Sequence, residues 1–226
     1  MSTPPFGPQY CETPDAITGI FPVEPANAIS SGIIVVFGLF ALVSVMRRTP
    51  NALSFYALCA LLIANGLGSI LWHGLRTRWA LTLDVLPALV FVAVAIVLWA
   101  RYVAPWREGV LVTAGAIALA VAVRFADLPV RGGWSVMAPF IITIAIWLIV
   151  RSYAASKKAA LIGGIAITSA MAALTFRSID GSMCDTVPMG THFLWHVFLS
   201  AAAFAVMQAL ITLETGRSTE AAAKAA

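Results

Sequence analysis

Long apolar segments alternate with short polar connections along most of the chain. Seven of these segments are predicted to be α-helices, at residues 28–46, 53–72, 83–100, 109–123, 136–150, 159–176 and 193–213. Most approach the roughly 20 residues that a helix needs to cross a bilayer core, while the fourth and fifth must borrow flanking residues. A membrane β-barrel would instead show segments of about ten residues with alternating polarity. The pattern therefore predicts an all-α integral membrane protein, a seven-transmembrane helix bundle.

Polar segments flank the apolar part of the chain at both ends. Residues 1–27, which we call the head, are rich in proline and are not expected to form a long helix. No apolar run precedes residue 28 and no Lys or Arg precedes Arg47, so the pattern does not fit a cleavable signal peptide. We expect the first span itself to direct insertion. Residues 28–213 form the predicted bundle, and residues 214–226 are predicted to be a disordered tail.

The composition agrees with a membrane protein and argues against a nucleic-acid partner. Only 11% of the residues are charged, against about 25% in ordinary soluble domains. The mean hydropathy is +0.93. The net charge is +4, but the basic residues stand singly or in pairs between apolar segments. This arrangement is typical of topology signals and not of a phosphate-binding surface.

The distribution of basic residues predicts the orientation of the bundle. Nine basic residues fall on one side: Arg47, Arg48, Arg101, Arg107, Arg151, Lys157, Lys158, Arg217 and Lys224. Five fall on the other side, which the head shares: Arg76, Arg78, Arg124, Arg131 and Arg177. Because cytoplasmic connections carry an excess of Lys and Arg, we expect the N-terminus outside and the C-terminus in the cytoplasm.

Seven spans would bring the most conspicuous polar residues to one membrane face. The second predicted helix ends outside at His73, the third begins outside just before Asp84, and the seventh begins outside at His192. His196 follows His192 by four residues and so shares its helix face. Polar side chains at membrane depth cost free energy unless they are paired or bind something. Three histidines and a carboxylate are the ingredients of a catalytic zinc site, in which three protein ligands leave one position for water.

Each of these residues also has an ordinary structural explanation. His73 at a helix end can interact with the terminal carbonyls, and Asp84 in the first turn of a helix is favoured by the helix dipole. Ser69 shares a helix face with His73, but a serine in a membrane helix usually bonds a backbone carbonyl. The pair His192 and His196 could be satisfied by hydrogen bonds between helices. The joint arrangement carries more weight than any one residue.

Three separated blocks of the sequence resemble the alkaline ceramidase family. The first is S-x3-H-x10-D-x2-P, formed by Ser69, His73, Asp84 and Pro87, which is followed by H-x3-H at His192 and His196. The head resembles the family's W-C-E motif at Tyr10, Cys11 and Glu12, and its E-x2-N-x2-S motif at Glu24, Asn27 and Ser30. The segment 180–196 is similar to the family's last outer loop. This family belongs to a superfamily of seven-helix membrane hydrolases that includes the adiponectin and progestin receptors.

The resemblance implies a zinc-dependent membrane amidase. Zinc would be held by His73, His192 and His196, with Asp84 as the group that moves the proton and Ser69 as a donor to the developing oxyanion. The implied reaction is hydrolysis of the amide of a ceramide-like lipid to a sphingoid base and a fatty acid. A site just inside the outer membrane face suits a substrate whose amide lies near the headgroups. The sequence does not specify acyl-chain preference or oligomeric state.

The resemblance also implies a calcium site in the head. In the ceramidases an acidic cluster binds calcium, and the matching candidates are Glu12 and Glu24, with Asp15 as a substitute ligand. Two positions depart from the family pattern: Gln9 replaces an acidic residue, and Pro14 replaces an asparagine. Because calcium takes about six to eight oxygen ligands, these departures remove two candidate ligands.

The chain has three cysteines, which permit one disulfide. Cys11 and Cys184 are both predicted to lie outside, while Cys59 lies within the second span. An oxidising outer compartment permits a bond between the first two, which would tie the head to the loop before the last helix. The alternative is two unrelated thiols.

Other functions remain open from the sequence alone. A receptor like the adiponectin receptors, with residual hydrolase activity, is the main alternative, although the head motif and D-x2-P favour a ceramidase. A retinal-binding protein is disfavoured because a Schiff base needs a lysine in the last helix, and residues 193–213 contain none. A purely structural membrane protein is the third alternative.

Overall fold

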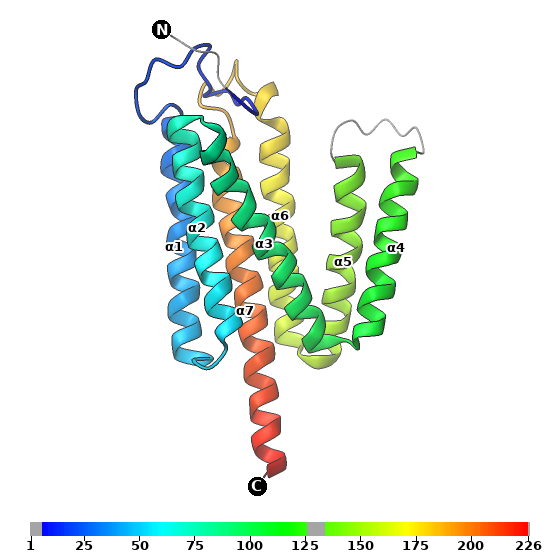
Figure 1. Ribbon diagram of the computed structural model, residues 1–226. Helices are drawn as coiled ribbons and strands as arrows, with labels where there is room; N and C mark the ends of the chain where they lie inside the picture. Colours follow the sequence, from blue (N-terminus) through cyan, green and yellow to red (C-terminus); the bar gives the residue numbers. More distant parts are fainter. Residues whose placement is uncertain (1–5, 126–133, 226) are drawn as a thin grey trace.

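The structure, a computed structural model, describes residues 6–125 and 134–225. Over these residues it contains seven α-helices and one short 3-10 helix (Figure 1). The helices are α1 (Pro25–Arg48), α2 (Leu53–Leu75), α3 (Arg78–Val103), α4 (Trp106–Phe125), α5 (Trp134–Ala155), α6 (Lys157–Ile179), η1 (Asp180–Ser182) and α7 (His192–Ala225). Each predicted apolar segment coincides with one α-helix, so the all-helical prediction is confirmed.

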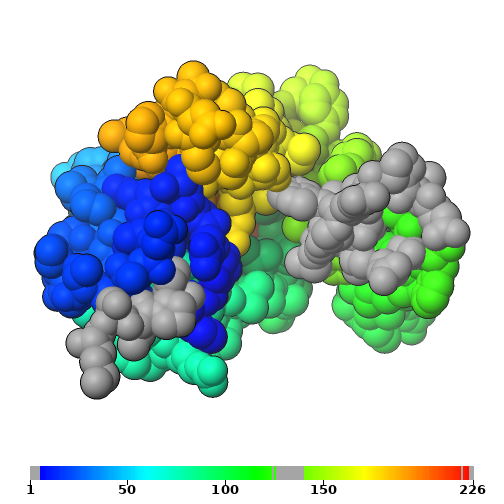
Figure 2. Space-filling view, turned by 90° about the horizontal axis from the view of Figure 1, so that it is seen from above, coloured from blue at the N-terminus to red at the C-terminus, as the bar shows by residue number. Residues whose placement is uncertain are grey.

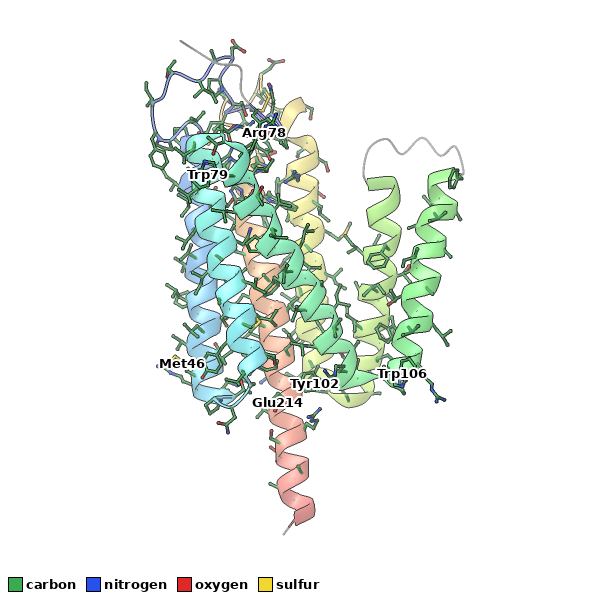
Figure 3. All side chains as sticks on the ribbon, viewed as in Figure 1. Met46, Arg78, Trp79, Tyr102, Trp106 and Glu214 are labelled. Carbon is green, nitrogen blue, oxygen red and sulfur yellow. A yellow bond between two sulfur atoms is a disulfide. The ribbon has the colours of Figure 1, made fainter. Side chains whose placement is uncertain are left out.

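Six of the described helices are long and apolar enough to cross a membrane, and Phe140–Ala155 within α5 is a shorter apolar helical stretch. Trp79 and Trp106 are exposed and lie near opposite ends of the bundle (Figure 3). Tryptophan is enriched at both membrane interfaces, so this placement agrees with a bundle that spans a bilayer. These features indicate a multi-pass membrane protein.

The compact part of the bundle is formed by α1, α2, α3, α6 and α7, and α4 and α5 form a hairpin beside α6 (Figure 1). Glycines allow the backbones of α1 and α2 to approach closely. A side chain at Gly38 would meet Ile63, and one at Gly66 would come within 2.8 Å of the Val35 nitrogen. Small residues at such crossings are typical of membrane helices, which gain packing contacts from close approach.

The third helix begins earlier than its apolar segment suggested. α3 starts at Arg78, so Asp84 lies in its second turn, and no acidic residue occupies the first turn. The expectation that Asp84 lies in the first turn of this helix was therefore wrong, and the alternative explanation by the helix dipole loses its basis. The connection between α2 and α3 is shorter than the polar segment of the sequence. Arg78 and Thr82 belong to α3 and are polar because they are exposed at the end of the bundle.

The C-terminal segment also differs from its prediction. Residues 214–226 were expected to be disordered, but α7 continues to Ala225. Alanine has the highest intrinsic helix propensity, and four of the six residues in 220–225 are alanine, so a long preceding helix can continue through them.

Candidate metal centre

Three histidines from two distant helices meet at the end of the bundle that carries the head. His73 comes from the last turn of α2, and His192 and His196 come from the first two turns of α7. One nitrogen from each ring lies within 4.8 Å of the others, and the side chains are only 1%, 1% and 2% exposed. This is the convergence that the helix parity predicted, and such a group could hold a metal ion.

Two of the imidazoles are oriented by partners at Nδ1. His73 Nδ1 lies 2.5 Å from Glu24 Oε2, and His196 Nδ1 lies 2.8 Å from Ser30 Oγ. With Nδ1 engaged, Nε2 is the nitrogen that each ring can offer to a metal. Metal-binding histidines commonly use the second ring nitrogen in this way, which fixes the orientation of the ring.

The third imidazole is held by stacking. The Tyr10 ring lies on His192, with centroids 3.7 Å apart and planes 22° apart, and it is 5.4 Å from the His73 ring. His192 Nδ1 is buried without a hydrogen-bond partner. A buried polar atom with no partner costs free energy, and a bound metal would remove that cost for this ring. Three neutral imidazoles are a donor set that suits zinc.

Ser69 and Asp84 lie beside one another but outside the histidine group. The Ser69 side chain accepts a hydrogen bond from Ser31 Oγ at 3.0 Å and neighbours the Asp84 carboxyl group. Ser69 is one helical turn before His73 on α2. Among the described residues, the group that could hold a metal contains no carboxylate. Asp84 therefore lies outside this group, next to Ser69 and Asn65.

The proline of the D-x2-P motif changes the backbone hydrogen bonding of α3 next to Ser69. Pro87 has no N–H, so the Leu83 carbonyl lacks its usual helical partner. This carbonyl lies against Gly68, where any side chain would collide with it, and the same side chain would come within 2.7 Å of the Asp84 nitrogen. Asn65 Nδ2 donates to the Asp84 carbonyl at 2.6 Å. Sequence reasoning missed both Gly68 and Asn65, because neither has a pattern of its own.

Asp180 connects the start of α7 to the head, and its role was also missed. Its Oδ1 accepts from the backbone N–H of Thr191 at 2.6 Å and of His192 at 2.8 Å, while Oδ2 accepts from Cys11 N–H at 3.0 Å. The carboxylate thus satisfies free donors at the start of α7. Because it lies 12 residues before His192, it does not follow the sequence pattern of an N-cap.

A disulfide joins Cys11 to Cys184, with Cα atoms 5.0 Å apart, and Cys59 is buried as a free thiol. This pairing agrees with the one expected from the sequence. Figure 2 shows the head lying against the segment that leads into α7. The bond therefore fastens the part of the head that places Tyr10 on His192.

The structure does not support a calcium site in the head. Glu12 accepts from the N–H groups of Ala26 at 2.6 Å and Asn27 at 2.9 Å, so its carboxylate caps α1. Glu24 is occupied by His73, and Asp15 is exposed. No group of three carboxylates that could bind a metal occurs among residues 6–125 and 134–225. Burial is the main cause that raises the pKa of Glu12 and of Glu24 above the usual range.

Comparison with known proteins gives one assignment. The family model described as Ceramidase matches residues 8–225, which is nearly the whole chain. None of the curated proteins compared with the chain matches it.

Proposed function

Because the chain belongs to the ceramidase family, and is therefore a ceramidase-like hydrolase of amide bonds, we propose that it is a zinc-dependent enzyme that cleaves ceramide-like lipids within the membrane. The observation that carries the proposal is the buried group of His73, His192 and His196. Zinc bound there would activate a water molecule and polarise the amide carbonyl. The products would be a sphingoid base and a fatty acid.

The remaining roles are assigned to residues that surround the histidines. Asp84 accepts a proton from the attacking water and passes it to the leaving amine. Ser69 donates a hydrogen bond to the carbonyl oxygen as negative charge develops on it. Glu24 and Ser30 hold the rings of His73 and His196 at Nδ1. Tyr10 covers His192 and limits access from the water side.

We also propose that the head and the metal centre face the extracytoplasmic side. The disulfide between Cys11 and Cys184 supports this orientation, because such bonds persist mainly in oxidising compartments. The excess of Lys and Arg in the opposite connections supports it independently. The amide of a lipid substrate would then lie near the outer headgroups, with its chains in the bilayer.

The direct test is turnover of a defined ceramide by purified protein in detergent, followed by mass spectrometry of both products. We expect stoichiometric release of sphingoid base and fatty acid, one zinc per chain, and loss of both zinc and turnover in His192→Ala and His196→Ala. A zinc-loaded protein that releases neither product from ceramides of several chain lengths would contradict the proposed activity. Zinc retained undiminished by both alanine variants would contradict the ligand assignment.

A further inference from the structure

Arg76 is a buried cation between the head and the metal centre. It follows α2 as the C-cap residue with φ of 53°, and only 2% of it is exposed. Its Nη1 lies 3.2 Å from Glu24 Oε1, and its Nη2 donates to the Pro8 carbonyl. The guanidinium carbon also lies 4.1 Å from the centroid of the Trp72 ring and 5.7 Å from the centroid of the Tyr10 ring.

These contacts link Arg76 to a histidine through one carboxylate. Glu24 Oε1 faces Arg76, and its Oε2 faces His73 Nδ1 at 2.5 Å. Nε and Nη1 of Arg76 make no hydrogen bond, so the carboxylate is held mainly by charge attraction and by the hydroxyl of Thr13 at 2.5 Å. Removing one partner of a buried ion pair leaves the other charge uncompensated and frees it to move.

The same contacts argue against a calcium site in the head. Calcium takes about six to eight oxygen ligands and favours a surplus of negative charge. Here the oxygens of Glu12 and Glu24 already accept hydrogen bonds or face a guanidinium. Gln9 adds no charge where an acidic residue was expected. A divalent cation beside Glu24 would also be repelled by Arg76.

We propose that Arg76 is a positioning residue whose guanidinium supplies the internal positive charge that holds Glu24 against His73, so that no calcium ion is needed in the head. The inference rests on the proposed metal site at the three histidines. Arg76 acts through Glu24 and does not touch the metal or the substrate. The positive charge also joins Pro8 and Tyr10 to the end of α2, which fixes the head above the centre.

The test compares Arg76→Met, Arg76→Lys and the matched control Arg78→Met. Arg78, the first residue of α3, is only two positions away but is exposed at the end of the bundle (Figure 3). Among the aromatic side chains described, its guanidinium contacts only the Phe6 ring. The readouts are zinc affinity by chelator competition and the visible spectrum of the cobalt-substituted protein, which reports ligand geometry at the metal. Thermal unfolding of the metal-free proteins controls for folding.

We expect Arg76→Met to weaken zinc binding about 10–100-fold, the usual effect of disturbing a partner of a metal-binding histidine. Its cobalt spectrum should change, Arg76→Lys should recover part of both properties, and Arg78→Met should match the wild type. A folded Arg76→Met protein with wild-type affinity and spectrum would overturn the inference. So would an equal loss of zinc affinity in Arg76→Met and in the control Arg78→Met.

A calcium experiment tests the same inference without any substitution. Wild-type protein is treated with EGTA in a buffer that holds free zinc constant, and calcium is then restored. Zinc affinity, cobalt spectrum and turnover should stay unchanged throughout. A loss that calcium reverses would overturn the inference even if the Arg76 variants do not fold. If the protein binds metal but hydrolyses no ceramide, the proposed activity fails while the metal readouts still decide the role of Arg76. A wild-type protein that binds no metal would overturn both.

Discussion

His73 Nδ1 lies 2.5 Å from Glu24 Oε2, so a head residue, one position before α1, completes the surroundings of a histidine that ends α2. The backbone reinforces this contact, because Glu24 N–H donates to the His73 carbonyl at 2.9 Å and Val23 N–H donates to the Gly74 carbonyl at 3.1 Å. Glu24 is fully buried. The head is therefore part of the candidate metal centre, and its acidic residue serves the histidine.

Replacing Glu24 with glutamine should weaken metal binding more than it weakens the fold. The amide keeps the size of the side chain but removes the charge that faces His73 and Arg76, and loss of such a partner costs about 10–100-fold in metal affinity. Zinc affinity of Glu24→Gln measured by chelator competition checks this, with the exposed Asp15→Asn as the matched control. Equal affinities in the two variants would show that Glu24 only fastens the head.

Gly68 should tolerate no side chain, because α3 presses on α2 at this position. A methyl group would collide with the Leu83 carbonyl and approach the Asp84 nitrogen, so Gly68→Ala must displace Asp84. Such overpacking costs about 1–3 kcal/mol. We expect a lower midpoint of thermal unfolding and a lower kcat.

The control for this substitution is Gly115→Ala on α4, where an added methyl group meets nothing within 4 Å. That change should leave stability equal or slightly higher, because alanine favours a helix over glycine. Equal stability and turnover in both variants would mean that α3 adapts without moving Asp84.

The sequence predicted the helices and the meeting of the three histidines because both depend on regular features. Apolar length determines which segments are helical, and the number of spans determines which helix ends share a face. It did not predict the start of α3, since Arg78 and Thr82 resemble a polar connection although they are helical. The first turn of a helix needs no apolar residues where it is exposed at the end of a bundle, so hydropathy cannot locate it.

The residues that orient the histidines were harder to find. Ser30 was noted only as part of a family motif, and Glu24 was expected to bind calcium. Asp180 and Arg76 had no assigned role. Their partners lie far away in sequence, as with Asp180 and Cys11 at a separation of 169 residues. No spacing rule connects such residues, because their contacts arise only when the head folds onto the bundle. The calcium expectation finds no support in the structure for the same reason, since the sequence does not reveal that Glu24 already faces Arg76 and His73.

The disulfide between Cys11 and Cys184 determines how many cysteines a thiol reagent can label. Labelling of the denatured, unreduced protein should modify one cysteine, Cys59, and labelling after reduction should modify all three. A peptide map of the labelled protein identifies the site. Three reactive thiols without reduction would contradict the bond and would remove one support for the proposed orientation.

Substitution of Asp84 should separate amide hydrolysis from metal binding. It neighbours Ser69 but does not belong to the histidine group, and it no longer has the explanation of a helix-start charge, because α3 begins six residues earlier at Arg78. Asp84→Asn should therefore keep zinc and fold while losing about 10²–10⁴-fold in turnover, the usual cost of removing a general acid and base. Ser69→Ala should lose a comparable amount if its hydroxyl is a main oxyanion donor, and less if it only orients the carbonyl.

The measurement for both variants is hydrolysis of a defined ceramide at matched zinc content, with thermal unfolding as the control for folding. Asn65→Ala is a useful third variant, because it removes the hydrogen bonds to the Asp84 carbonyl and, at 3.4 Å, to Asp84 Oδ1 while the carboxyl group itself is kept. Its turnover should fall between those of the wild type and Asp84→Asn, since the carboxylate is less well positioned but still present. Near-normal turnover in a folded, zinc-loaded Asp84→Asn protein would show that the proton is moved by another group, and the proposed roles of Asp84 and Ser69 would have to be abandoned.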